Sequence, residues 1–173
     1  MVKFRIIKKI YNFLIFYSGD IIRAYGILLC RVLGNIGINT TNNKIKNIEF
    51  LFLKASYGNN HWTPPKGLVE NNEEGLNTAI RETFEETGLK KDKYKLLNFE
   101  KTLKYLVNGK PKETTYYLAI LLNKDENIIL SDEHTDYSWI KSGQSNEYFL
   151  SPSLHDLMIN AEEYLINNSS LIQ

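Results

Sequence analysis

The chain has 173 residues and a formal net charge of +1, from 21 basic and 20 acidic side chains. This balance gives no argument for nucleic acid or an anionic surface as a partner. The length suits one domain, and no apolar run approaches the roughly 20 residues that cross a bilayer. Cys30 is the only cysteine, which excludes an internal disulfide and fits a reducing compartment. We therefore expect a cytoplasmic monomer.

The residue pattern says least about the structure and role of the first 22 residues. Basic residues precede the apolar run 10–17, which Asn12 interrupts. Three interpretations stay open: an extension that packs on the domain or is partly disordered, a targeting peptide, and a basic helix on a membrane surface. We favour the first and divide the chain into an N-terminal extension, a domain and a C-terminal tail, at residues 1–22, 23–168 and 169–173.

Strands and turns follow from apolar and β-branched runs separated by Gly, Asn and Pro. Residues 35–47 predict a loop, and Asn108-Gly109 predicts a two-residue hairpin turn. Pro64 and Pro65 favour an extended segment. Ser151 before Pro152 predicts the start of a helix over 151–166. We expect strands at 24–33, 48–56, 95–107, 113–123 and 137–140.

The stretch 62–89, WTPPKGLVENNEEGLNTAIRETFEETGL, organises the chain. Its second half allows a helix of about four turns. Asn71 can serve as the N-cap, with Glu74 three residues on completing a capping box. Gly88 can end the helix in a left-handed turn, against which Leu89 packs.

Two faces of this helix differ in character. An apolar stripe at helical spacing can face a core, and it comprises Leu76, Ile80, Thr83 and Thr87. Glu82, Glu85 and Glu86 share a neighbouring face that carries no lysine. A solvated acidic face is the ordinary interpretation of such a cluster. A hard divalent cation such as Mg²⁺ would neutralise it.

The spacing matches the signature G-x5-E-x7-R-E-U-x-E-E-x-G-U, from Gly67 through Glu73 and Arg81 to Leu89. The chain therefore resembles the Nudix hydrolases. One position departs, because Thr83 stands where the signature has a bulky apolar residue. The resemblance implies an α/β fold, an α/β/α sandwich with a mixed central sheet.

The resemblance also implies roles for the residues of the signature. Glu82, Glu85 and Glu86 match metal-binding glutamates for Mg²⁺, with Mn²⁺ as a substitute, and the carbonyl of Lys66 or Gly67 is a further candidate ligand. Arg81 matches an arginine that orients glutamates through ion pairs. Glu73 is its expected partner, and a helix-surface pair with Glu85 is the alternative.

Segments outside the signature indicate which group of Nudix hydrolases the chain resembles. HWTPPKG, RET, KPK and SDEHTDYSWI look like the asymmetrical diadenosine tetraphosphate hydrolases of the animal and archaeal type. That group implies cleavage of a small dinucleoside polyphosphate to ATP and AMP. Glu133 matches a carboxylate that contacts metal or acts as general base, and Glu82 is the rival base. Leu68 departs from the group, which often has histidine there.

Substrate contacts are expected from two kinds of side chain. Candidates to bind phosphate are His61, Lys66, Lys104, Lys110 and Lys112. Candidates to stack on adenine are Tyr105, Tyr116 and Phe149, and the two tyrosines face each other only if the hairpin register is right. Tyr117, His134 and Trp139 are interpreted as structural.

Alternatives remain open within and outside this enzyme class. Other Nudix hydrolases act on diphosphoinositol polyphosphate, ADP-ribose or RNA 5′ ends. A non-catalytic module that binds nucleotide or a protein partner is disfavoured, because modules of that kind lose signature glutamates. All of them are present here: Glu73, Glu82, Glu85 and Glu86.

Overall fold

A computed structural model describes residues 21–34, 47–70 and 72–172. The predictions for the N-terminal extension up to residue 20 and for the loop at 35–46 lie outside the described residues. Within the described ranges, none of the helices combines the length and the apolar character that crossing a bilayer requires.

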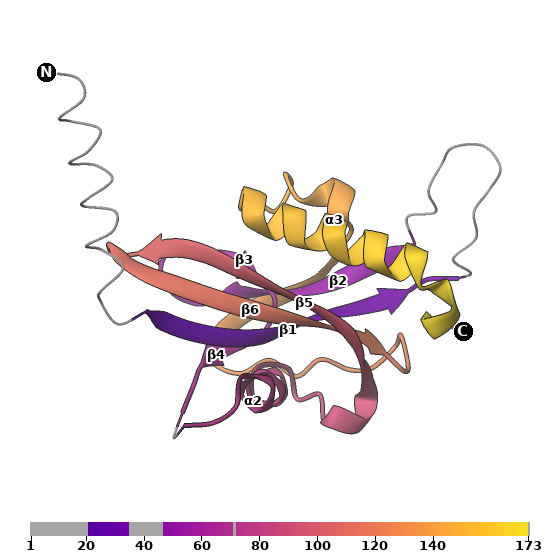
Figure 1. Ribbon diagram of the computed structural model, residues 1–173, viewed down its shortest axis with the longest axis horizontal. Coiled ribbons are helices and arrows are strands. Elements are labelled where there is room, and N and C mark those ends of the chain that lie inside the picture. The colour runs from indigo at the N-terminus through magenta and orange to yellow at the C-terminus, as the bar shows by residue number, and fades with distance from the viewer. Residues whose placement is uncertain (1–20, 35–46, 71, 173) are drawn as a thin grey trace, which may run out of the picture.

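The chain builds one mixed seven-stranded sheet with the central order β3-β2-β1-β6-β5 (Figure 1). Strand β4 pairs with β1, and β7 pairs with β2. Only β1 and β6 run parallel; every other pairing is antiparallel. All the predicted strands are confirmed. The strands are β1 Ile22–Val32, β2 Ile48–Ala55, β3 Trp62–Thr63, β4 Lys66–Leu68, β5 Tyr94–Val107, β6 Lys110–Leu121 and β7 His134–Ile140.

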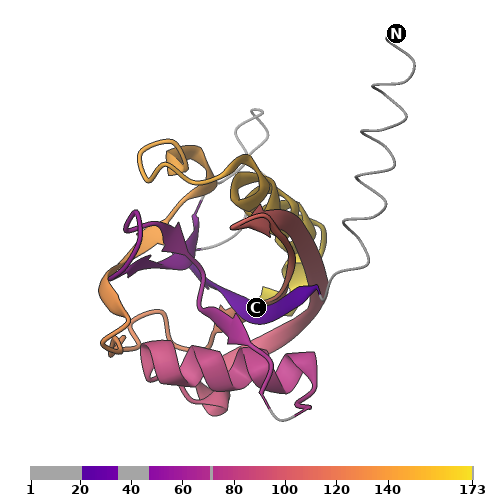
Figure 2. The same ribbon diagram turned by 90° about the vertical axis from the view of Figure 1, so that its left-hand side faces the viewer.

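Two helices cover the two faces of this sheet. Helix α2 (Gly75–Thr87) crosses beneath β1 and β4, and α3 (Pro152–Asn167) lies in the concave side of the curved sheet (Figure 2). Short 3₁₀ turns complete the chain at Lys91–Lys93, Ser142–Gln144 and Ser169–Ile172. The predicted α/β/α sandwich is confirmed.

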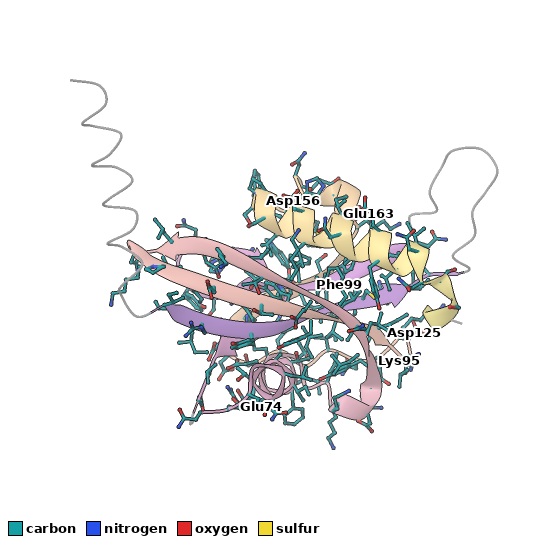
Figure 3. All side chains as sticks on the ribbon, viewed as in Figure 1. Glu74, Lys95, Phe99, Asp125, Asp156 and Glu163 are labelled. Atoms are coloured by element: carbon teal, nitrogen blue, oxygen red, sulfur yellow. The ribbon has the colours of Figure 1, made fainter. Side chains whose placement is uncertain are left out.

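The core has two layers because the sheet buries both faces. Leu28, Cys30 and Phe52 point to α3 and meet Leu157 and Met158. Phe99 of β5 lies on the same side and packs at 5.4 Å from the ring of Tyr164 (Figure 3). Side chains of the opposite face meet α2, among them Ile27, Leu29, Leu51 and Ala79.

The β5–β6 hairpin forms around the predicted turn. Asn108 and Gly109 both have positive φ, 51° and 77°, which a two-residue hairpin turn requires. The register places Tyr105 opposite Lys112 and Tyr116 opposite Lys101. The register that would make Tyr105 and Tyr116 face each other across the hairpin is therefore not the one observed, although both lie on the same face.

The ends of the helices test the capping predictions. Gly88 ends α2 in a left-handed conformation with φ 71°, as predicted, and Leu89 is buried. Ser151 caps α3 by accepting a hydrogen bond from the Leu154 amide. The predicted cap at Asn71 is wrong, because α2 begins at Gly75 and Glu74 occupies the N-cap position without a side-chain bond.

The apolar stripe of α2 was also placed slightly wrongly. Leu76 is exposed, whereas Thr78 and Ala79 are fully buried. The helix is turned so that Thr83 and Thr87 face the sheet, as predicted. Thr83 fits there because its hydroxyl donates to the Ala79 carbonyl at 2.7 Å, so its own buried hydroxyl is not left unpaired.

Candidate active site

A short strap, residues 64–68, holds the signature against the sheet. Pro64 and Pro65 lie between strands β3 and β4, with a bend at Pro65, and the Ile27 amide donates to the Pro65 carbonyl at 3.1 Å. A Cβ at Gly26 would lie only 2.3 Å from that oxygen, so glycine permits this approach. Strand β4 then pairs with β1, and the strap runs beside α2.

Gly67 lies directly against the carboxyl group of Glu82. A Cβ at this position would fall 2.0 Å from Glu82 Cδ. The glycine of the signature therefore makes room for one of its glutamates, and Glu82 lies against the strap backbone.

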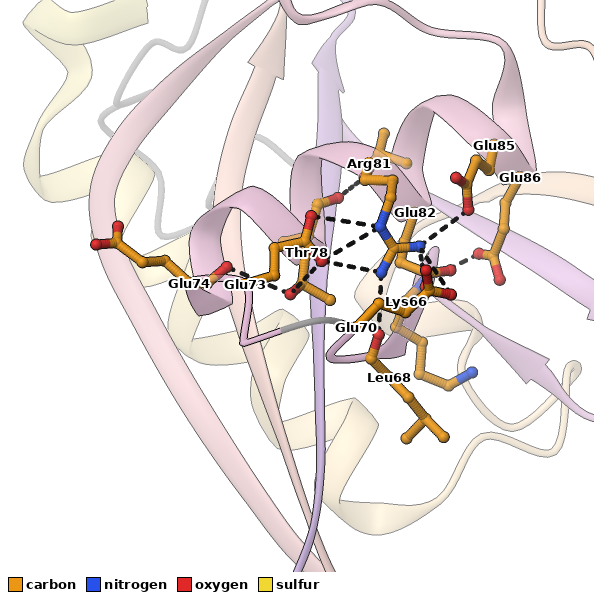
Figure 4. Close-up of polar contacts among 12 residues, drawn as sticks. Lys66, Leu68, Glu70, Glu73, Glu74, Thr78, Arg81, Glu82, Glu85 and Glu86 are labelled. Atoms are coloured by element: carbon orange, nitrogen blue, oxygen red, sulfur yellow. Dashed lines mark hydrogen bonds and ion pairs between the residues drawn. The ribbon is translucent and has the colours of Figure 1, made fainter.

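Arg81 lies at the centre of a group of carboxylates (Figure 4). Its Nη1 donates to Glu82 at 2.7 Å and to Glu85 at 3.0 Å, while its Nη2 donates to Glu73 at 3.1 Å. Nη2 also donates to the Leu68 carbonyl at 3.0 Å. The predicted pair with Glu73 is confirmed, and the i,i+4 pair with Glu85 is present beside it.

The Arg81 contacts also settle what position 68 supplies. The carbonyl of Leu68 accepts from Arg81, and its side chain is exposed. The bond to Arg81 is therefore made by the backbone and does not depend on the side chain at position 68.

Glu86 is the most buried of the signature glutamates, with 6% of its surface exposed. Its Oε2 accepts from the Lys66 amide at 3.0 Å. Burial raises its pKa to about 8, and the charges of Glu82 and Glu133 act in the same direction. Burial also raises the pKa of Glu82, despite the hydrogen bond from Arg81.

Glu133, directly before strand β7, also lies near the glutamates of α2 although it is distant from them in sequence. Strand β7 pairs with β2, and the Ser56 amide donates to the Glu133 carbonyl at 2.9 Å. The charge of its side chain contributes to the raised pKa of both Glu82 and Glu86. The structure therefore brings Glu133 close to the half-buried Glu82 and the buried Glu86.

Two neighbours were not identified as site residues from the sequence. His134 Nε2 lies 3.9 Å from Glu86 Oε1, so its interpretation as purely structural is incomplete. Tyr57 is close enough for Glu133 and Glu86 to contribute to its raised pKa, after burial, and its ring meets His61 edge-on. The signal for both was their position next to Glu133 and next to the HWTPPKG segment.

A basic group borders the carboxylates. Lys66, Lys112 and His61 lie near one another: burial lowers the pKa of His61, and the charges of Lys66 and Lys112 lower it further. Burial also lowers the pKa of Lys112, again with a contribution from Lys66. Three of the five predicted phosphate contacts are therefore together, and Lys110 is exposed at the hairpin tip on the same face as Lys112.

Lys104 lies on the other face of the hairpin. It pairs across the strands with Glu113, and its Nζ lies 3.0 Å from that carboxylate. Because side chains alternate along a strand, Lys104 and Lys112 point to opposite faces. The prediction that Lys104 joins the phosphate group is wrong.

The three predicted aromatic contacts have different environments. Tyr116 is 2% exposed and belongs to the α3 side of the core, so the structure contradicts an open stacking face for it. Tyr105 is 38% exposed, and its hydroxyl bonds the Thr114 hydroxyl at 2.7 Å. Phe149 is 94% exposed with a positive φ of 51°. Its neighbour Tyr148 packs edge-on against Trp62.

The carboxylate group fits a divalent cation. Glu82, Glu85, Glu86 and Glu133 carry more negative charge than the Arg81 guanidinium compensates, and burial raises the pKa of two of them. Hard cations bind carboxylate and carbonyl oxygens of this kind. Among the described residues no three acidic, histidine or cysteine side chains converge as ready ligands, because Arg81 holds Glu82 and Glu85.

Comparison with known proteins decides the family. The NUDIX domain profile matches residues 34–157. The chain belongs to the NUDIX family. A solved structure of a Caenorhabditis elegans Ap4A hydrolase binary complex superimposes with a TM-score of 0.74 and 33% identity, covering 85% of this chain and 99% of that one.

Two curated NUDIX relatives carry the same name, bis(5′-nucleosyl)-tetraphosphatase (asymmetrical). The protein of Rattus norvegicus is 48% identical over 94 residues, 54% of this chain and 64% of its own length, so the match spans less than two thirds of that relative. The protein of Caenorhabditis elegans is 39% identical over 120 residues, 69% of this chain and 78% of its own length.

Proposed function

We propose that this NUDIX protein hydrolyses diadenosine tetraphosphate asymmetrically, to ATP and AMP, with Mg²⁺ as cofactor and Mn²⁺ as a substitute. The observation that carries the proposal is the juxtaposition of two groups. Glu82, Glu86 and Glu133 form a partly buried acidic group, and Lys66, Lys112 and His61 border it. The names of the relatives give the substrate class.

The acidic group would hold the cation through Glu82, Glu85, Glu86 and the Gly67 carbonyl. When bound, Mg²⁺ neutralises phosphate oxygens and makes a bound water more acidic. Arg81 fixes the orientations of Glu82 and Glu85 by its ion pairs. Glu133, which is exposed and next to the buried carboxylates, accepts a proton from the attacking water, and Glu82 is the alternative base.

The basic group would bind the polyphosphate. The ammonium groups of Lys66 and Lys112 attract its charge, and Lys110 extends the same face toward the hairpin tip. Burial and the nearby lysines lower the pKa of His61, which favours a neutral imidazole that can donate one hydrogen bond to a phosphate oxygen.

Tyr105 and Phe149 supply the aromatic surfaces for adenine. Tyr105 pairs with Lys112, so its ring lies next to a phosphate-binding lysine. Phe149 follows Tyr148, which is anchored to Trp62 directly after His61. An exposed phenylalanine with positive φ is strained, and strain of this kind occurs at ligand-binding segments.

Product analysis tests this function. The purified protein is incubated with Mg²⁺ and diadenosine tetraphosphate, beside separate reactions with ADP-ribose, diphosphoinositol polyphosphate and capped RNA. We expect equal amounts of ATP and AMP from the first substrate and much slower turnover of the others. Glu86→Gln should abolish turnover, and Glu74→Gln is the matched control, since Glu74 belongs to the same segment but only marks the helix start.

Other product patterns would contradict either the substrate assignment or catalysis itself. Two ADP, or preference for another substrate, would contradict the substrate assignment and leave the hydrolase chemistry. Nucleotide that binds without product, with any divalent metal, would contradict catalysis and support a nucleotide-binding module instead.

A further inference from the structure

Glu86 is contacted on both of its oxygens. Its Oε2 accepts from the Lys66 amide at 3.0 Å, and its Oε1 faces His134 Nε2 at 3.9 Å. The side chains of Glu86 and His134 are only 7% and 5% exposed. An electrostatic contact between two groups so well shielded from water is stronger than the same contact at a surface.

His134 is held in place by its own surroundings. It opens β7 opposite Ala55 of β2, and its amide donates to the Ser131 carbonyl at 3.1 Å. On the ring, Nδ1 lies 3.5 Å from the Ser131 hydroxyl. A neutral imidazole carries one N–H. When the Ser131 hydroxyl donates to Nδ1, the ring hydrogen of His134 must be on Nε2, which is the nitrogen that faces Glu86.

The chain next to His134 also carries Glu133. The Ser56 amide donates to the Glu133 carbonyl, which fixes the backbone of this segment on β2. One short segment therefore brings both a carboxylate and an imidazole to the site. The carboxylate has an expected role in the reaction, whereas no role follows for the imidazole from the sequence signature.

We propose that His134 is a positioning residue whose Nε2, 3.9 Å from Oε1, restricts the orientation of the Glu86 carboxylate, so that Oε1 is presented to the divalent cation. This inference rests on the proposed function only in assigning Glu86 as a metal ligand. Partners behind a metal ligand fix its orientation, and losing one commonly weakens metal affinity about 10–100-fold. Because the contact is 3.9 Å long, we expect the lower end of that range.

Two amide substitutions separate the two ring nitrogens. The amide nitrogen of His134→Gln occupies roughly the place of Nε2, whereas the amide of His134→Asn reaches only the place of Nδ1. Binding of Mn²⁺ without nucleotide, measured from the spin-resonance signal of the free ion, is the readout. We expect His134→Asn to weaken Mn²⁺ binding about tenfold and His134→Gln to weaken it by much less.

His155→Asn is the matched control, because His155 lies on α3 across the sheet, and it should leave Mn²⁺ affinity unchanged. Thermal unfolding without metal shows that each variant folds. Equal weakening by both His134 variants, or no weakening in either, would overturn the inference. Wild-type protein that binds Mn²⁺ through Glu86 but does not cleave diadenosine tetraphosphate would overturn the proposed function and leave the inference on His134 standing.

Discussion

Two partly buried arginines, Arg31 and Arg81, hold glutamates in opposite ways. Arg31 makes two short contacts to a single partner, Glu49, at 2.7 and 2.9 Å. Its guanidinium also lies over the Trp139 ring at 4.5 Å, which supports the structural interpretation of Trp139. Arg81 is shared among Glu73, Glu82 and Glu85, with Glu70 at 4.0 Å.

The difference lies in charge balance. At Arg31 the single carboxylate, Glu49, is fully compensated by the guanidinium across the β1–β2 pair and by Lys141 at 3.9 Å. At Arg81 the carboxylates outnumber the guanidinium, and the buried Glu86 and nearby Glu133 add to the excess. Balanced charge of the first kind serves stability. Retained excess charge in a buried place costs stability and indicates a bound cation.

Glu86→Gln should give the largest effect. Loss of a metal ligand worth about 4 kcal/mol would lower kcat about 10³-fold. The amide can still accept the Lys66 N–H, and it removes a buried charge, so the free energy of unfolding without metal should stay the same or rise. Steady-state kinetics measure the fall in kcat, and urea unfolding measures the free energy of unfolding without metal. A large loss of stability with normal kcat would reverse our assignment.

Glu49→Gln should show the opposite pattern. It breaks the balanced pair and leaves Arg31 partly buried without its counterion. We expect the free energy of unfolding to fall by about 1–3 kcal/mol, with kcat and KM unchanged. Urea unfolding beside the product assay checks this. A loss of activity in folded Glu49→Gln protein would show that the Arg31 pair is not merely structural.

The two hairpin lysines extend the comparison to substrate binding. Lys104 is paired with Glu113, whereas Lys112 lies near the like charge of Lys66. Lys112→Met should raise KM about tenfold, ~1.4 kcal/mol, near the lower end for a hydrogen bond to a charged group. Lys104→Met is the control and should change KM little. Equal effects of both would contradict the assignment of the two faces.

A smaller effect is expected at His61. Burial lowers its pKa first, and the charges of Lys66 and Lys112 lower it further. Removing one of those charges with Lys112→Met should therefore raise the pKa of His61, so that the ring becomes protonated at a higher pH than in the wild type. NMR titration of the histidine ring signals measures the shift. An unchanged or lower pKa would show that Lys112 lies too far from His61 to act on a shared phosphate.

Local signals in the sequence predicted local structure well. Asn108-Gly109 made the hairpin turn, Gly88 ended α2 and Ser151 capped α3, because each depends on the backbone preference of one or two residues. The cap at Asn71 failed, since α2 begins only at Gly75 and Glu74 occupies the N-cap position. The pair of Arg81 and Glu73 was predicted from the resemblance to the signature, and the structure confirms it.

The parts of the site that depend on strand register were harder to predict. Tyr116 is buried under α3, and Lys104 points away from Lys112, because alternation along the hairpin assigns each side chain to a face. The contact between His134 and Glu86 depends on the pairing of β7 with β2, which no local pattern encodes. The prediction of Glu133 as a site residue came from a resemblance and not from spacing, and the structure places it near Glu82 and Glu86.

Thermal unfolding with and without Mg²⁺, at matched ionic strength, tests the central claim that the excess charge at Arg81 serves a cation. We predict that Mg²⁺ raises the Tm of wild-type protein and of Glu49→Gln, because an ion that binds only the folded state stabilises it. The Tm of Glu86→Gln should not respond, and without Mg²⁺ this variant should be at least as stable as the wild type. An equal rise in all three proteins, or no rise in the wild type, would contradict the account.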